Sequence, residues 1–120
     1  MSVSTRLTQL LHIKHPILLA PMDLVSDGRL AAAVTRAGGF GVIGGGYGDE
    51  KWLAREMDAA GDARVDIGFI TWSMAKRPRL LDMALERRPP AVMLSFGDIR
   101  PHAPSRSEAI RLARRALKLK

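Results

Sequence analysis

Gly39-Phe40-Gly41-Val42-Ile43-Gly44, residues 39–44, contains a short apolar run that starts at Phe40 and is bounded by glycines. The run is too short for a buried helix and is typical of a buried strand. Similar runs begin at Pro16, Asp66 and Ala91, and the four starts lie 24, 26 and 25 residues apart. Continuous apolar runs fit parallel strands covered on both faces, so the pattern predicts four buried parallel strands.

Amphipathic segments separate the four runs and predict helices. Ser26 or Asp27 can cap the first helix, and Gly38 can end it. Its apolar residues recur at helical spacing, which predicts that it buries Leu30, Val34 and Ala37.

The second and third predicted helices have similar signals. Asp49 can cap the second and Gly61 can end it, with Leu53, Met57 and Ala60 predicted to point inward. Pro78 suits the first turn of the third, which is predicted to bury Leu81 and Leu85. The alternation predicts an α/β fold with right-handed crossovers, either an open doubly wound sheet or part of a barrel.

Residues 39–44 also match the G-x-G-x-x-G fingerprint of dinucleotide-binding folds. That fingerprint must follow a strand and open a helix, whereas this match follows a predicted helix and contains the strand itself. We therefore reject a Rossmann site. The glycines at 44–46 and 48 leave two interpretations open: a backbone that approaches a flat ligand closely, or a flexible loop after the strand.

Composition excludes several function classes. The chain has no cysteine, which rules out disulfides, iron–sulfur clusters and cysteine nucleophiles. His12, His15 and His102 lack metal-ligand spacing, so no metal site is predicted. No apolar run approaches the roughly 20 residues that span a bilayer, and no signal peptide is recognisable. These observations predict a cytoplasmic protein without a membrane partner.

The net charge of +7 is concentrated at the end of the chain. Residues 99–120 hold seven basic side chains and one acidic one, Glu108. The basic residues alternate with apolar ones at helical spacing, and no aromatic residue lies among them. This pattern predicts the solvated face of a basic helix rather than a nucleic-acid site.

Several segments together resemble the start of the nitronate monooxygenase (2-nitropropane dioxygenase-like) family. The resemblance covers residues 8–98 and is carried by four stretches in this order: His15-Pro16-Ile17-Leu18-Leu19-Ala20-Pro21-Met22, then Leu30–Val34 with Ala37–Gly44, then Ile67-Gly68-Phe69-Ile70-Thr71-Trp72, and last Ser95-Phe96-Gly97-Asp98. The same opening also resembles the flavin-dependent enoyl-acyl-carrier-protein reductases.

The resemblance implies an FMN-dependent TIM barrel that oxidises alkyl nitronates with O2 to a carbonyl compound and nitrite. It places the flavin at the carboxyl ends of the strands, where this fold builds its active sites. Trp72 would line the pocket or form a buried plug, and Ser95 and Gly97 would lie on the same rim. No catalytic residue is assigned. The residues expected to hold the cofactor are Ala20, Pro21, Met22, Gly44, Gly45 and Thr71.

After Asp98 the family pattern stops. We therefore expect the N-terminal half of a barrel at 1–98, about four βα units, and a divergent basic helical tail at 99–120. The loops that would grip a cofactor phosphate belong to the other half, as does the histidine that looks catalytic in the family. His12, His15 and His102 do not replace it.

Two apolar sheet edges would be open in such a half-barrel. The sequence thus predicts a truncated enzyme with weak or no activity that self-associates as a homo-oligomer. The alternatives are a non-catalytic half-barrel subunit, a module whose basic tail binds an anionic surface, and a tail created by a truncation or frame change.

Overall fold

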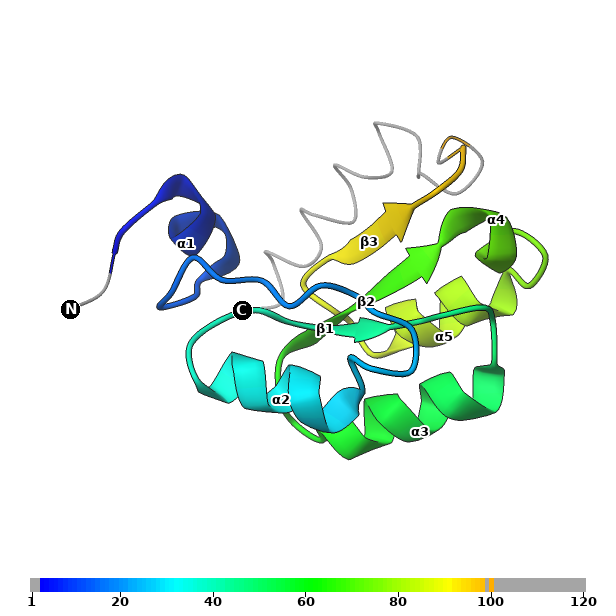
Figure 1. Cartoon of the computed structure of the whole chain (residues 1–120), viewed down its shortest axis with the longest axis horizontal. Helices are drawn as coiled ribbons and strands as arrows, with labels where there is room; N and C mark the ends of the chain where they lie inside the picture. Colours follow the sequence, from blue (N-terminus) through cyan, green and yellow to red (C-terminus); the bar gives the residue numbers. More distant parts are fainter. Residues whose placement is uncertain (1–2, 99, 101–120) are drawn as a thin grey trace.

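The computed structural model describes residues 3–98 and 100, and it contains one parallel sheet of three strands (Figure 1). The strands are β1 (Gly41–Gly44), β2 (Val65–Ile70) and β3 (Val92–Ser95), in the order β1-β2-β3. The last three of the four predicted runs are therefore confirmed as strands. Apart from Arg100, the predicted basic tail and His102 lie outside the described residues.

The prediction of a strand that begins at Pro16 was wrong. Residues 16–20 form only an isolated parallel bridge, between Leu18 and Phe40. Phe40 N–H donates to the Ile17 carbonyl and Leu19 N–H donates to the Phe40 carbonyl, both at 2.9 Å. Prolines limit this pairing, because Pro16 has no N–H to donate and Pro21 restricts the residue before it. The segment is extended and lies beside β1, but the ladder does not propagate.

Three crossover helices lie along one face of the sheet (Figure 1). They are α2 (Gly28–Arg36), α3 (Glu50–Ala60) and α5 (Arg79–Glu86). Sequential strand order with right-handed crossovers puts every helix on the same side, whereas a doubly wound sheet has helices on both. The arrangement is therefore that of a barrel segment rather than of a doubly wound sheet. The short helices α1 (Arg6–Leu11) and α4 (Thr71–Met74) were not predicted.

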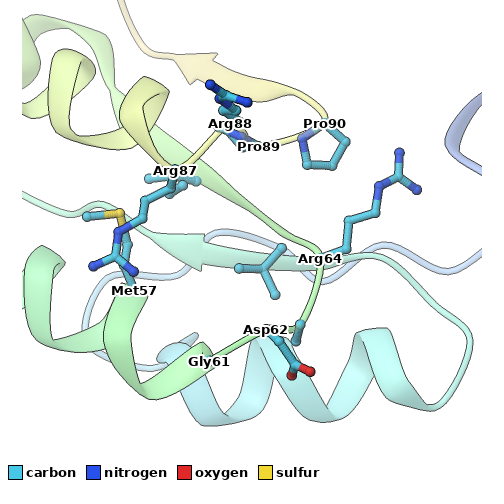
Figure 2. A pocket seen from close by; sticks show the side chains of 11 residues that line it. Met57, Gly61, Asp62, Arg64, Arg87, Arg88, Pro89 and Pro90 are labelled. Atoms are coloured by element: carbon cyan, nitrogen blue, oxygen red, sulfur yellow. The ribbon is translucent and has the colours of Figure 1, made fainter. Parts of the chain in front are cut away.

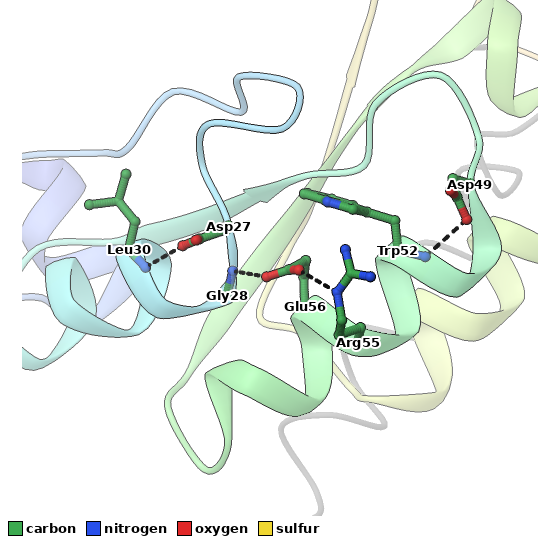
Figure 3. A network of polar contacts seen from close by, with 7 residues as sticks. All are labelled: Asp27, Gly28, Leu30, Asp49, Trp52, Arg55 and Glu56. Atoms are coloured by element: carbon green, nitrogen blue, oxygen red, sulfur yellow. Dashed lines mark hydrogen bonds and ion pairs between the residues drawn. The ribbon is translucent and has the colours of Figure 1, made fainter.

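Helix α3 confirms its predicted ends and inward face. Asp49 is its N-cap, Gly61 follows its last turn with a φ of 62°, and the inward residues Leu53, Met57 and Ala60 are buried. The capping carboxylate accepts from Trp52 N–H at 2.9 Å (Figure 3). Leucine and methionine at helical spacing identify the buried face of this helix.

The inward faces of α2 and α5 differ from those predicted. Helix α2 buries Gly28, Ala31 and Ala32, while Leu30 stays 37% exposed. A Cβ at Gly28 would lie 1.9 Å from the Glu56 carbonyl oxygen, so α2 contacts α3 too closely for large side chains. The expectation for Leu30, Val34 and Ala37 was therefore wrong.

In α5, Leu80 and Ala84 are buried, Leu81 is partly buried against the core, and the prediction for Leu85 was wrong. The buried positions are displaced by one residue from those predicted, and Leu85 is among the exposed large apolar residues. The helix begins after Pro78, as expected.

A buried carboxylate joins α2 to α3 (Figure 3). Glu56 Oε2 accepts from Gly28 N–H at 3.1 Å, and Glu56 Oε1 accepts from Arg55 Nε at 3.1 Å. Asp27 caps α2 by accepting from Leu30 N–H at 2.7 Å. Two carboxylates thus meet the positive end of the α2 dipole, which fixes where α2 begins relative to the sheet.

Candidate active site

The carboxyl ends of the three strands meet at one edge of the sheet, because the strands are parallel. Gly44 ends β1 opposite Gly68, and Ile70 in β2 lies opposite Ser95, the last residue of β3. The loops that follow these residues therefore form one rim. Most of the residues predicted from the sequence to hold a cofactor lie in these loops or at the strand ends.

The segment that contains Ala20, Pro21 and Met22 packs on this rim. A Cβ at Gly68 would lie 2.3 Å from the Pro21 Cβ, and a Cβ at Gly44 would lie 2.4 Å from the Met22 carbonyl oxygen. The Met22 side chain remains 42% exposed. The structure thus brings the predicted residues of the first segment onto β1 and β2 and leaves the thioether accessible.

Ser26 holds this segment in place, a role that the sequence did not reveal. Its side chain is fully buried, and its Oγ accepts from Met22 N–H at 2.7 Å and donates to the Met22 carbonyl at 2.8 Å. The Ser26 carbonyl accepts from Gly44 N–H at 2.9 Å. The helix cap is Asp27, so the serine that precedes it is used to attach the loop to β1.

Gly44 and Gly45 are needed for packing within the protein. Gly45 N–H donates to the Gly68 carbonyl at 2.7 Å, and a Cβ at Gly45 would lie 2.6 Å from the Phe69 ring. The two glycines thus face protein atoms in the direction of a side chain. Gly46, with a φ of 58°, and Gly48, with a φ of 95°, provide the turn that follows.

Thr71 begins α4 directly after β2 and is 1% exposed. Its Oγ1 is the one buried side-chain oxygen or nitrogen without a hydrogen-bond partner in the part of the chain that the structure describes. Gly97 lies next to it, since a Cβ there would be 3.1 Å from the Thr71 Cβ. A buried hydroxyl without a partner costs stability and calls for a specific explanation, such as a ligand that completes it.

Trp72 is half exposed, so the interpretation of this residue as a buried plug was wrong. Its ring lies 6.0 Å from the Tyr47 ring, measured between centroids, at an interplanar angle of 53°. Lys76 Nζ lies 5.4 Å from the Trp72 ring centroid. The contact joins the loop after β1 to the helix after β2. No pattern in the sequence predicts it, because the two rings meet only in the folded structure.

A cavity of about 360 Å³ lies at the opposite end of the strands, between the segments that lead into β2 and β3 (Figure 2). Arginines line it, but Arg64 Nη1 donates to the Leu11 carbonyl at 2.6 Å and Arg87 pairs with Asp58. Their side chains and that of Arg88 point in different directions in Figure 2. The cavity therefore lacks convergent donors for an anion.

Residues 3–98 and 100 contain neither a candidate metal centre nor a candidate membrane span. No group of three or more His, Cys, Asp and Glu side chains in this part of the chain could hold a metal ion. Nor does any helix found there have the length and apolar character needed to cross a membrane.

Comparison with known proteins gives a consistent result. The nitronate monooxygenase family pattern matches residues 4–88. A probable nitronate monooxygenase of Staphylococcus saprophyticus is 44% identical over 57 residues, which are 48% of this chain and 16% of that protein. One from Staphylococcus aureus is 43% identical over 53 residues, 44% of this chain and 15% of that protein.

A solved structure shares the fold. FabK from Thermotoga maritima matches 96% of this chain and 42% of its own chain with a TM-score of 0.73 and 27% identity. A mutant of FabK from the same organism gives a TM-score of 0.69 and 29% identity over 95% of this chain and 37% of its own.

The parallel sheet and these matches define an α/β protein of a flavin-dependent oxidoreductase family. The chain belongs to the nitronate monooxygenase family, whose pattern covers most of its length. It spans less than half of FabK, and its matched segments span under a fifth of the two staphylococcal relatives.

Proposed function

We propose that this chain supplies the FMN-contacting half of a nitronate monooxygenase-type site, at the carboxyl ends of its strands. The observation that carries the proposal is the buried Thr71 hydroxyl, which has no partner in the described part of the chain and lies on the rim formed by the strand ends. An unpaired hydroxyl and an accessible thioether suit a planar ligand with polar edges.

Each predicted residue has a role that its position supports. The thioether of Met22 packs against the flavin ring, and backbone groups of Ala20 and Pro21 face its edge. Thr71 Oγ1 hydrogen-bonds a polar atom of the ring. Gly44 and Gly45 act indirectly, because their lack of a side chain lets the Met22 backbone and the Phe69 ring approach β1.

Bound FMN supplies the electron transfer by which an alkyl nitronate is oxidised with O2 to a carbonyl compound and nitrite. The residues of this chain bind and orient. None of the side chains described at the rim is assigned as an acid or a base. We therefore expect weak or no turnover by this chain alone.

The open edges favour a barrel that further strands complete. β3 is half-buried along its whole length, and Ile17 and Leu18 beside β1 are exposed. Exposed apolar edges pair readily with other strands. We propose that a second copy of the chain occupies these edges when no other barrel segment does, giving a homo-oligomer. A purely monomeric species in sedimentation equilibrium would contradict this.

Visible absorbance tests the cofactor proposal. The protein is mixed with FMN, desalted and scanned, and we expect a retained flavin band with altered fine structure. Bovine serum albumin treated in parallel is the control for carry-over. A colourless protein would overturn FMN binding by this chain and favour the non-catalytic alternative, a self-associating subunit.

The second enzymatic candidate is an activity like that of flavin-dependent enoyl-acyl-carrier-protein reductases. The structural likeness over 96% of the chain to FabK keeps this candidate open. The two activities differ in their electron donor, so the test compares the FMN-loaded protein under two conditions. Oxygen uptake driven by a nitronate supports the first candidate, whereas reduction of an enoyl thioester driven by a nicotinamide supports the second.

A further inference from the structure

Tyr47, Trp72 and Lys76 form a cluster on the rim, which we call the aromatic–lysine cluster. Tyr47 is 65% exposed and Trp72 is 50% exposed, although their rings are in contact. Lys76 Nζ lies 5.4 Å from the Trp72 centroid, within the range of a cation–π contact. Two accessible rings and a cation thus face solvent together, directly after Thr71.

The loop that carries Tyr47 is held at both ends. Gly45 N–H donates to the Gly68 carbonyl at 2.7 Å, and Arg77 Nη1 donates to the Gly48 carbonyl. Between these anchors, Gly46 has a φ of 58°, in the left-handed region that favours glycine. The ring is therefore positioned by the backbone before any ligand arrives, which lowers the entropic cost of binding.

Lys76 differs in its partners from the neighbouring basic residues. Arg77 donates to a carbonyl, and Arg79 pairs with Glu50 at 3.6 Å. Among the ion pairs of residues 3–98 and 100, none involves Lys76. The only specific contact of its side chain in this part of the chain is the Trp72 ring, so its charge is available to an anion.

We propose that the aromatic–lysine cluster binds the anionic substrate, a small alkyl nitronate, at the mouth of the site. The two rings contact the alkyl group, and the Lys76 ammonium attracts the delocalised negative charge of the nitronate oxygens. This inference rests on the proposed function. It adds a discrimination: the nitronate anion is bound in preference to the neutral nitroalkane.

The test follows the indole N–H of Trp72 by NMR in the full chain carrying Trp52→Phe, which leaves a single tryptophan signal. Propane-2-nitronate is titrated at constant ionic strength and at a pH where the anion persists, and neutral 2-nitropropane is titrated in parallel. We expect a saturable shift with the nitronate and a much smaller one with the nitroalkane.

Substitution of Lys76 makes the test specific. Lys76→Met should raise the half-saturation concentration of the nitronate by about 1.4- to fivefold, the range expected for one exposed charge pair. Lys76→Arg, which keeps the charge, should leave the half-saturation concentration close to that of the wild type. Lys14→Met, which removes a lysine from the opposite end of the strands, is the matched control and should leave it unchanged.

Three results would overturn the proposal: a shift that does not saturate, equal shifts in the Lys76→Met and control proteins, or displacement of the nitronate by an equal concentration of inorganic phosphate. The last would assign the cluster to a phosphate group instead. FMN retention of the same variants is measured separately. Retained FMN without a nitronate shift would reject the cluster alone, whereas a saturable shift without retained FMN would reject the cofactor proposal.

Discussion

The Ser26 hydroxyl binds both backbone groups of Met22, accepting from its N–H at 2.7 Å and donating to its carbonyl at 2.8 Å. The backbone carbonyl of Ser26 also accepts from Gly44 N–H, so one buried serine connects the first loop of the rim to β1. This contact determines where the Met22 thioether lies relative to the strand ends.

Ser26→Ala should therefore loosen the rim and the fold together. It removes the hydroxyl bonds to the Met22 N–H and carbonyl, while the N–H keeps its contact with the Ala20 carbonyl and the Met22 carbonyl still accepts from Ser26 N–H. Loss of hydrogen bonds whose groups keep another partner should lower the free energy of unfolding by about 0.5–1.5 kcal/mol. Urea unfolding measures this cost. Ser4→Ala, at an exposed serine whose Oγ accepts from the Gln9 side chain, is the control and should change stability by less than about 0.5 kcal/mol.

The contact between α2 and α3 makes Gly28 intolerant of a side chain. Gly28→Ala would put a methyl group 1.9 Å from the Glu56 carbonyl oxygen if nothing moved. The helices must separate, and overpacking of this kind costs about 1–3 kcal/mol even though alanine favours helix. Thermal unfolding should show a lower Tm for Gly28→Ala than for the wild type. The control Arg29→Ala, at the exposed neighbouring position, should leave the Tm almost unchanged. An unchanged Tm would mean that the helices separate freely.

Asp66 should make stability depend on pH. Its side chain is buried at the start of β2, where Oδ1 accepts from Ala91 N–H at 2.8 Å. Burial raises the pKa of Asp66 from 3.8 to about 7, against the opposing effects of this hydrogen bond and of Arg64. The folded state therefore binds the proton more tightly than the unfolded state.

The sign follows from this difference. The stabilisation is complete below the unfolded pKa and is lost as pH rises through the folded pKa, so the free energy of unfolding should fall between pH 4 and 7 by up to about 1.4 kcal/mol per pH unit. Asp66→Asn keeps an oxygen that can accept from Ala91 and removes the titration. Denaturant unfolding of Asp66→Asn across this range should show a free energy of unfolding that falls less steeply with pH than in the wild type. Equal pH dependence in the two proteins would contradict the assignment.

The sequence predicted most of the sheet, but it predicted the inward faces of the helices that pack on the sheet only in part. Phe40–Gly44 and Asp66–Ile70 were recognisable as strands because each is a short apolar run bounded by turn residues. Residues 16–20 gave the same signal, but prolines limit their pairing to one bridge. Leu53 and Met57 identified the inward face of α3, whereas the close contact at Gly28 selected small residues in α2, contrary to helical periodicity.

The candidate site was predictable where chain order determines position. Thr71 and Ser95 fall at strand ends, and parallel strands bring such residues to one edge without further information. The sequence left Ser26 and Asp27 as alternative caps, because a serine before a helix resembles a cap, and the structure confirms Asp27. The contact of Tyr47 with Trp72 depends on how the loop after β1 folds back on α4, which no local pattern in the sequence encodes.

The last prediction separates the binding role of Thr71 from a structural one. Thr71→Val keeps the shape of the side chain and removes an oxygen that is buried without a partner in the described structure. Relief of that desolvation should raise the free energy of unfolding by about 1 kcal/mol, while FMN retention after desalting should fall.

Thr35→Val is the matched control. Its Oγ1 donates to the Arg64 carbonyl and accepts from Gly41 N–H, both at 3.0 Å, so the same change there should destabilise the fold by about 1–3 kcal/mol. Opposite signs for the two valine variants, with flavin retention impaired at Thr71, would mean that the Thr71 hydroxyl serves the ligand at the expense of the fold. Destabilisation at both positions would mean that the Thr71 hydroxyl is already satisfied within the protein and would remove the main support for the cofactor site.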